Sequence, residues 1–186
     1  FYSHAGWAQL LEDDAELRGY EAVGVCAHIV PWNFPLLMAA NKLIPSVSTG
    51  NTCVVKPSPY TPLATAMLSE MAAEAFPAGV MNIMTGGDEL GQMMVEHPKI
   101  AQISFTGSAA TGKKIMATGA ATLKKVTLEL GGNDPAVILP DVEAADVAPK
   151  IFQGAMFNTG QVCCAIKRVF GATPACSALH RHLVLL

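Results

Sequence analysis

The chain has 186 residues, of which 51% are hydrophobic and only 15% are charged, and its formal net charge is −3. It has no basic run and no alternation of basic and aromatic residues, which argues against a nucleic-acid partner. No apolar stretch is long enough to span a bilayer, so we expect no membrane partner. The five irregularly spaced cysteines favour reduced thiols and a cytoplasmic location over a disulfide framework.

Short apolar runs alternate with amphipathic segments over residues 1–130. This alternation predicts an α/β fold in which a parallel, Rossmann-like sheet has helices on both faces. The predicted strands are 23–30, 52–55, 80–84, 100–105 and 125–130. The predicted helices are 2–17, 36–47, 61–75, 89–96 and 108–118. Thr61 is the expected N-cap of the third helix, with Pro62 at its first helical position.

The pattern changes after residue 130, where we place a domain boundary. Residues 131–170 hold a predicted strand at 136–139 and a helix at 144–157, which indicates the start of a second α/β domain. Residues 171–186 have no clear period and no acidic residue, so this segment is atypical. We hypothesise that it is a frameshifted or mispredicted end, which the nucleotide sequence would decide.

Polar residues follow the predicted strands of the first domain. They are Asn33, Lys56, Gly86, the run Thr106-Gly107-Ser108, and Glu129. In open parallel sheets, ligands bind beyond the carboxyl ends of the strands. The sequence therefore predicts a ligand site along this edge of the sheet.

A cysteine, Cys163, comes directly after the polar turn Asn158-Thr159-Gly160-Gln161 and Val162. If a helix begins there, its N-terminus would favour the reactive thiolate. Cys163 is therefore a candidate nucleophile. The alternative is that Cys163 is a buried structural cysteine of a helix.

Five segments resemble the aldehyde dehydrogenase superfamily in their order and approximate spacing. They are Pro31-Trp32-Asn33-Phe34-Pro35, Val55-Lys56-Pro57-Ser58, Phe105-Thr106-Gly107-Ser108, Glu129-Leu130-Gly131-Gly132 and Gly160-Gln161-Val162-Cys163. The resemblance covers about residues 1–170. It implies a cofactor-binding domain at 1–130 and part of a catalytic domain at 131–170. It also implies NAD(P)-dependent oxidation of a small aldehyde to a carboxylic acid, in a family whose full-length members are homo-oligomers.

The resemblance assigns three catalytic roles. Cys163 is the nucleophile that forms a thiohemiacetal and then a thioester. Asn33 and the backbone N–H of Cys163 stabilise the oxyanion. Glu129 is the general base that activates water for hydrolysis of the thioester. The alternatives are that Asn33 caps a turn between two prolines and that Glu129 is a surface residue.

The resemblance also implies cofactor contacts, chiefly from Lys56 to the adenosine ribose, and no metal site. The other expected cofactor-binding residues are Val30, Pro31, Trp32, Ser58, Gly86, Thr106, Gly107, Ser108 and Leu130. Relatives that prefer NAD often carry a glutamate where this chain has Pro59. The cofactor is therefore NAD or NADP.

Two other functions stay open at this stage. Residues 107–114 are one residue away from a phosphate-binding P-loop, but Lys114 replaces the Ser or Thr that would ligate magnesium. The second alternative is a truncated, catalytically inert fragment that at most binds dinucleotide, because relatives are more than twice as long.

Overall fold

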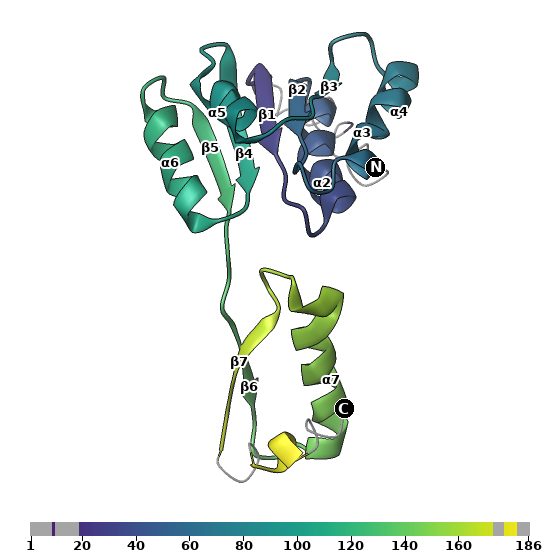
Figure 1. Ribbon diagram of the computed structural model, residues 1–186, viewed down its shortest axis with the longest axis vertical. Coiled ribbons are helices and arrows are strands. Elements are labelled where there is room, and N and C mark those ends of the chain that lie inside the picture. Colours follow the sequence, from purple (N-terminus) through teal and green to yellow (C-terminus); the bar gives the residue numbers. More distant parts are fainter. Residues whose placement is uncertain (1–8, 10–18, 173–176, 182–186) are drawn as a thin grey trace. The chain divides into compact units, whose positions relative to one another are not determined.

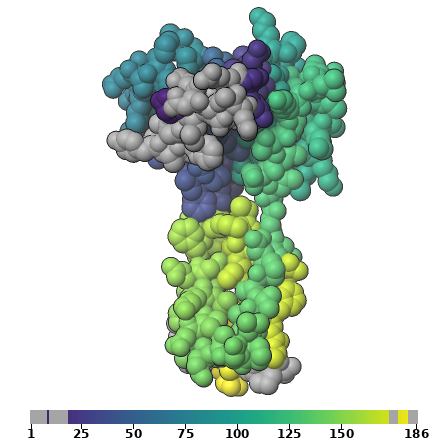
Figure 2. All heavy atoms as spheres, turned by 180° about the vertical axis from the view of Figure 1, so that it is seen from behind, coloured from purple at the N-terminus to yellow at the C-terminus, as the bar shows by residue number. Residues whose placement is uncertain are grey.

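The structure, a computed structural model, describes residue 9, residues 19–172 and residues 177–181. The chain divides between Leu130 and Gly131 into two compact units, unit 1 and unit 2. Each unit has its own sheet, and the colours of Figures 1 and 2 follow each unit along the chain. The predicted helix at 2–17 lies outside the described residues apart from Gln9, which is helical.

Unit 1 contains a five-stranded parallel sheet in the order β3-β2-β1-β4-β5 (Figure 1). The strands are β1 (Val25–Ile29), β2 (Thr52–Lys56), β3 (Met81–Ile83), β4 (Ile100–Thr106) and β5 (Lys125–Glu129). The chain adds β2 and β3 on one side of β1, and then returns to add β4 and β5 on the other. This reversal between β1 and β4 is the kind of switch point at which open sheets bind ligands.

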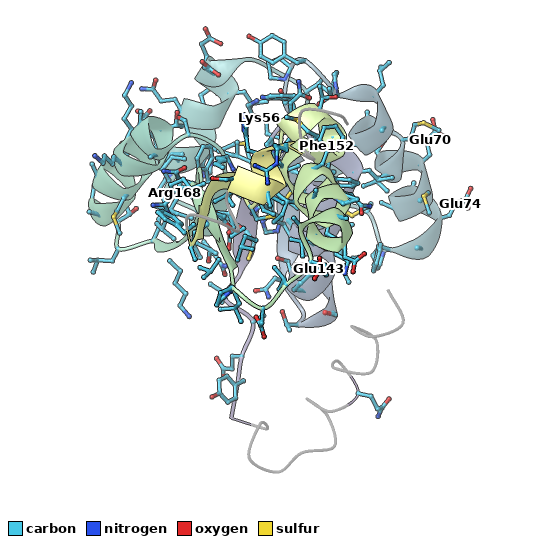
Figure 3. All side chains as sticks on the ribbon, turned by 90° about the horizontal axis from the view of Figure 1, so that it is seen from below. Lys56, Glu70, Glu74, Glu143, Phe152 and Arg168 are labelled. Carbon is cyan, nitrogen blue, oxygen red and sulfur yellow. The ribbon has the colours of Figure 1, made fainter. Side chains whose placement is uncertain are left out.

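Helices cover both faces of this sheet, which confirms the predicted fold class. The helices of one face are α2 (Pro35–Ser48), α3 (Leu63–Ala66) and α4 (Leu68–Ala75), and those of the other are α5 (Asp88–Glu96) and α6 (Ala109–Ala120). α4 is amphipathic: Leu68 and Ala72 are buried, while Glu70 and Glu74 point away from the sheet (Figure 3).

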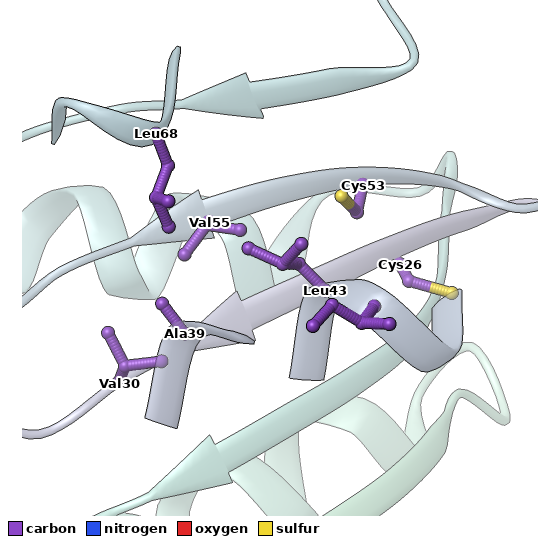
Figure 4. Packing of buried hydrophobic residues seen from close by; sticks show 8 residues of the cluster. Cys26, Val30, Ala39, Leu43, Cys53, Val55 and Leu68 are labelled. Atoms are coloured by element: carbon purple, nitrogen blue, oxygen red, sulfur yellow. The ribbon is translucent and has the colours of Figure 1, made fainter. Parts of the chain in front are cut away.

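The core between α2 and the sheet follows from the alternation of side chains along a strand. Cys26 and Val30 point toward α2, where Leu43, only 2% exposed, packs between β1 and β2 (Figure 4). Ala27 belongs to the second core, under α5 and α6. Loss of a fully buried leucine side chain such as that of Leu43 typically costs about 2–5 kcal/mol of stability.

One predicted helix start is wrong. Helix α3 begins at Leu63 after Pro62, and no side chain caps it. The Thr61 hydroxyl instead donates to the backbone carbonyl of Trp32 at 3.1 Å. The side chain of Thr61 is therefore hydrogen-bonded to a partner 29 residues away in the sequence. This hydrogen bond joins the loop after β2 to the loop after β1.

Unit 2 is a single βαβ arrangement. It comprises the parallel strands β6 (Asp134–Ile138) and β7 (Ile166–Gly171), with α7 (Ala144–Met156) and the short turn η1 (Phe157–Gly160) between them. Ile138, Ala148, Ile151 and Leu179 form its core. In the part of the chain that the structure describes, no helix is both long enough and apolar enough to cross a bilayer.

Candidate functional site

The carboxyl edge of the unit 1 sheet brings together the predicted site residues of residues 1–130. Lys56, Thr106 and Glu129 are the last residues of β2, β4 and β5, and Asn33 follows β1 by four residues. Gly86 follows β3 by three residues. Because all five strands are parallel, these positions share one edge. Cys163 belongs to unit 2.

Lys56 is held at this edge by backbone carbonyls. Its side chain is buried, and Nζ donates to Gly86 O at 3.0 Å and to Pro57 O at 3.1 Å (Figure 3). Burial lowers the pKa of Lys56, and the charge of Asp88 opposes this. Two of the three ammonium protons are used in this way, so the third can serve a ligand hydroxyl.

A hollow of about 560 Å³ lies between α5 and α6. Lys56, Ile29, Phe105 and Lys114 contribute to its walls. Gly91 of α5 also lines it, and a Cβ there would be in ordinary van der Waals contact with Lys56 Cε at 3.5 Å. Ile29 and Phe105 come from β1 and β4, so the hollow lies at the switch point of the sheet.

Thr106 and Glu129 are register partners at the ends of β4 and β5. Phe105 packs in the core under α6, so the alternation along β4 turns Thr106 toward the opposite, α2 face. Thr106 Oγ1 is buried and has no hydrogen-bond partner among the described residues. The Glu129 carboxylate is exposed, and its backbone carbonyl accepts from Gly107 N at 3.0 Å. The edge therefore offers one unused buried hydroxyl and one accessible carboxylate.

The other predicted cofactor residues of unit 1 line the same edge. Val30 N donates to Lys56 O at 3.1 Å, and Ser58 is buried, its hydroxyl accepting from Tyr60 N at 3.3 Å. Ser108 is the N-cap of α6, and its hydroxyl accepts from Thr111 N at 3.2 Å. A helix N-terminus that follows a parallel strand presents backbone N–H groups to an anion.

Sequence reasoning missed a buried polar cluster behind this edge. Lys42 of α2 donates from Nζ to Ser104 Oγ at 2.9 Å. Burial lowers the pKa of Lys42, and the charge of Glu129 opposes this. The signal was a single lysine, the one charged residue of the mostly apolar segment 36–47. A buried lysine in such a helix needs a specific partner.

His28 completes this cluster. Its side chain is 1% exposed, and Nε2 lies 2.8 Å from Ser46 Oγ. The Ser46 hydroxyl also lies 3.1 Å from Lys42 O, to which it can donate. His28 Nδ1 is buried and has no hydrogen-bond partner among the described residues. Burial, assisted by the charge of Lys42, lowers the pKa of His28 from 6.5 to about 4. His28 is therefore neutral at physiological pH.

Cys163 lies in a turn between η1 and β7, and its side chain is exposed. No helix begins there, so the prediction of a thiol at a helix N-terminus is wrong. The strain lies in the preceding segment η1: Asn158 and Thr159 have left-handed φ values of 50° and 60°. A β-branched residue in this left-handed region costs on the order of 1–3 kcal/mol, and such strain tends to occur at functional sites.

The neighbouring thiol, Cys164, is also exposed. A hollow of about 360 Å³ in unit 2 is lined by Cys164 together with Val162 and Phe157. Cys163 does not line it. The structure therefore offers two accessible thiols side by side, and any functional experiment has to tell them apart.

The main chain at Cys163 is tightly enclosed within unit 2. A Cβ added to Gly132 would lie 2.2 Å from the Cys163 carbonyl oxygen, so only glycine fits at position 132. A Cβ on Gly131 would meet nothing within 4 Å. The same carbonyl accepts from Lys167 Nζ at 2.7 Å. The sequence shows a Gly131-Gly132 pair but not which of the two has to be glycine.

Among the described residues, no group of three or more His, Cys, Asp or Glu side chains could hold a metal ion. The sheet of unit 1 is parallel and has a switch point, an open carboxyl edge and an adjoining hollow. These features are typical of the dinucleotide-binding folds.

Comparison with known proteins gives the family. The aldehyde dehydrogenase family model matches residues 7–184. An aldehyde dehydrogenase of Agaricus bisporus is 44% identical over 178 residues, which are 90% of this chain and 36% of that protein. The chain belongs to the aldehyde dehydrogenase family, and it spans about a third of the length of such relatives.

Solved structures of related enzymes also match the fold of this chain. The NAD+ complex of an aldehyde dehydrogenase from Bacillus cereus is 42% identical, with a TM-score of 0.86 over 89% of this chain and 34% of that chain. An NADP-dependent enzyme of E. coli is 34% identical, with a TM-score of 0.85 over 89% of this chain and 35% of that chain.

Proposed function

We propose that this chain carries out the NAD(P)-dependent oxidation of a small aldehyde to a carboxylic acid through Cys163. One observation carries the proposal. An exposed thiol follows the strained segment η1, in a chain whose parallel sheet gathers Asn33, Lys56, Thr106 and Glu129 at one edge. Family membership supports it. A cytoplasmic location and homo-oligomers, as in full-length relatives, stay predictions.

The residues of unit 1 fit a dinucleotide. The hollow between α5 and α6 is large enough for a ring system. Lys56, which lines the hollow, offers an ammonium proton to a ribose hydroxyl. Pro59 supplies no carboxylate to select against a 2′-phosphate. Both NAD and NADP are therefore proposed cofactors, as the two solved relatives also suggest.

The reaction begins when the Cys163 thiolate adds to the aldehyde carbon. The π electrons of the carbonyl move onto oxygen, and the Asn33 amide and the Cys163 backbone N–H donate to this oxyanion. NAD(P), held by Lys56 at the edge of the sheet, would supply a hydride acceptor. Loss of hydride from the carbon bonded to Cys163 would leave that carbon as a thioester on the sulfur. Glu129 then takes a proton from water, the water oxygen attacks the thioester, and the carboxylic acid leaves with the thiol restored.

Aldehyde-dependent formation of NAD(P)H tests this proposal. Cys163→Ala should abolish product formation and leave dinucleotide binding unchanged, because the thiol acts only on the aldehyde. Cys164→Ala is the matched control, since both thiols are exposed, and it should retain product formation. Product formation that survives Cys163→Ala, or that is lost only in Cys164→Ala, would refute the assignment.

A second candidate is dinucleotide binding without turnover. It is favoured by one observation: the Lys56 contacts, Thr106 and the hollow all lie within unit 1, while the chain spans about a third of its relatives. Titration of NAD and NADP followed by fluorescence tests it. Binding without aldehyde-dependent product supports this module, and absence of both supports the inert fragment.

A further inference from the structure

Lys167 of β7 places its ammonium group against the main chain of the Cys163 turn. Nζ donates to Cys163 O at 2.7 Å, to Val162 O at 2.9 Å and to Ala165 O at 3.0 Å. All three ammonium donors are thereby matched to carbonyl acceptors. Hydrogen bonds with a charged donor are about twice as strong as neutral ones. Lys167 therefore fixes this turn more firmly than an uncharged side chain would.

The bond to Val162 O has a direct consequence for the next residue. The Val162 carbonyl and the Cys163 N–H belong to one planar, trans peptide unit, so they point in opposite directions. Holding the carbonyl toward Lys167 thus aims the Cys163 N–H away from it. A cation on the carbonyl also polarises the peptide unit and strengthens its N–H as a donor.

The peptide unit that follows, between Cys163 and Cys164, is also restricted. The Cys163 carbonyl lies so close to Gly132 that a Cβ there would come within 2.2 Å of it. Next to Lys167, Arg168 Nε donates to Asn133 O at 2.8 Å, which anchors β7 to the segment before β6. The strand that carries Lys167 is therefore held in place by a hydrogen bond of the next residue along it.

We propose that Lys167 is a positioning residue for the oxyanion site: it orients the Cys163 N–H that receives the developing negative charge. This inference rests on the proposed function, in which the thiolate adds to a carbonyl carbon and the carbonyl π electrons move to oxygen. Lys167 touches neither the aldehyde nor the cofactor in this scheme. It acts through the backbone of Cys163.

The test uses the whole chain and two reactions of the same thiol. Alkylation of Cys163 by iodoacetamide, followed on the Cys163 peptide by mass spectrometry at the high-pH plateau, forms no oxyanion. Reversible addition of propanal, read at the same pH as protection of Cys163 against alkylation, does form one. The variants are Lys167→Met, which keeps the length but removes the donors, and Lys167→Arg, which restores them. Lys99→Met, at an exposed lysine in the turn before β4, is the control.

Lys167→Met should raise the propanal concentration needed for half-protection by about tenfold, a fraction of the 10²–10³ that follows complete loss of an oxyanion donor. The rate at which iodoacetamide alkylates Cys163 at the high-pH plateau should change by less than about twofold in this variant, because alkylation needs no oxyanion donor. Lys167→Arg should recover most of the protection, and Lys99→Met should match the wild type. Equal loss of alkylation and protection, or no loss of protection, would overturn the role of Lys167. Absence of protection in the wild-type chain would instead refute the proposed function.

Discussion

Unit 1 and unit 2 differ in the kinds of side chain that they bury. Every buried polar or charged side chain that the structure describes, including His28, Lys42 and Lys56, lies in unit 1. Among its described residues, unit 2 buries only apolar side chains, and it leaves Val137 69% and Leu139 58% exposed. The larger sheet can enclose polar groups because it has a helix layer on each face, whereas the two-stranded sheet of unit 2 has α7 and the short helical segment 177–181.

The two units also hold the residues of the candidate site in place in different ways. In unit 1, side chains such as Lys42 and Lys56 are held by partners far away in the sequence, Ser104 and Gly86. In unit 2, the main chain around Cys163 accepts three hydrogen bonds from Lys167, a partner two to five residues away in the sequence. The buried polar side chains of unit 1 and the hydrogen-bonded Cys163 turn of unit 2 should therefore respond differently to mutation and to pH.

The largest expected effect is a proton-linked loss of stability confined to unit 1. His28 has a pKa of about 4 when folded and about 6.5 when unfolded. The unfolded chain therefore binds more protons between these values, and stability is lost as pH falls from about 6.5 to 4. The loss amounts to about 3 kcal/mol. Urea unfolding followed by NMR signals of each unit should show a steeper acid dependence in unit 1.

His28→Gln should remove most of this acid dependence, because glutamine does not titrate. His97→Gln, at an exposed histidine, should keep it. An identical acid slope in the wild-type chain and in His28→Gln would show that the buried histidine does not set the pH response of unit 1.

The next effect concerns the turn in unit 2. Gly132→Ala places a Cβ against the Cys163 carbonyl, so the turn has to move. A displacement of about 1 Å at a reacting group can cost about 10²-fold in rate, and we expect a loss of that order in aldehyde oxidation. Steady-state kinetics measure it. Gly131→Ala, with open space around its Cβ, should change the rate little, and equal losses in both variants would contradict the account.

A smaller effect is expected for the cofactor edge of unit 1. Lys56→Met removes a charged donor, and hydrogen bonds to charged groups contribute about 1.5–3 kcal/mol, so NAD(P) affinity should fall about tenfold or more. Fluorescence titration gives the affinity, and thermal unfolding checks that the variant is folded. Lys125→Met, at an exposed lysine at the start of β5, should bind like the wild type. Unchanged affinity in Lys56→Met would remove Lys56 from the site.

The smallest effect concerns the choice of cofactor. Pro59→Glu introduces a carboxylate three residues after Lys56, where it should repel the 2′-phosphate of NADP. An exposed charge interaction contributes about 0.2–1 kcal/mol, so NADP affinity should fall by a factor of about 1.4 to 5 relative to NAD. Competitive titration measures the ratio. Pro59→Gln has nearly the same shape without the charge, and an equal shift in that variant would rule out electrostatic selection.

The fold could be predicted from the sequence because its signals are local. Apolar runs alternate with amphipathic segments, and the polar residues that end the strands mark the carboxyl edge. The Cys163 turn could not be predicted in this way. The left-handed residues of the preceding η1, Asn158 and Thr159, and the contact of Cys163 with Gly132 depend on packing. A polar turn before a cysteine equally fits a helix start.

Long-range partners explain the other misses. Lys42 and Ser104 are 62 residues apart, and the Thr61 hydroxyl is taken by the Trp32 carbonyl rather than by its own helix. Lys167 looks like an ordinary strand lysine until its three carbonyl partners are seen. The atypical character of residues 171–186 stays a prediction. In that segment the structure shows Leu179 in the core of unit 2.

The central claim is that Cys163 carries the acyl group and Glu129 releases it. The most direct measurement is mass spectrometry of Glu129→Gln after mixing with an aldehyde and NAD(P) and quenching in acid. We predict an adduct on the Cys163 peptide whose added mass is that of the aldehyde minus two hydrogen atoms. Formation of NAD(P)H with Cys163 unmodified, or with the adduct on Cys164, would contradict the account.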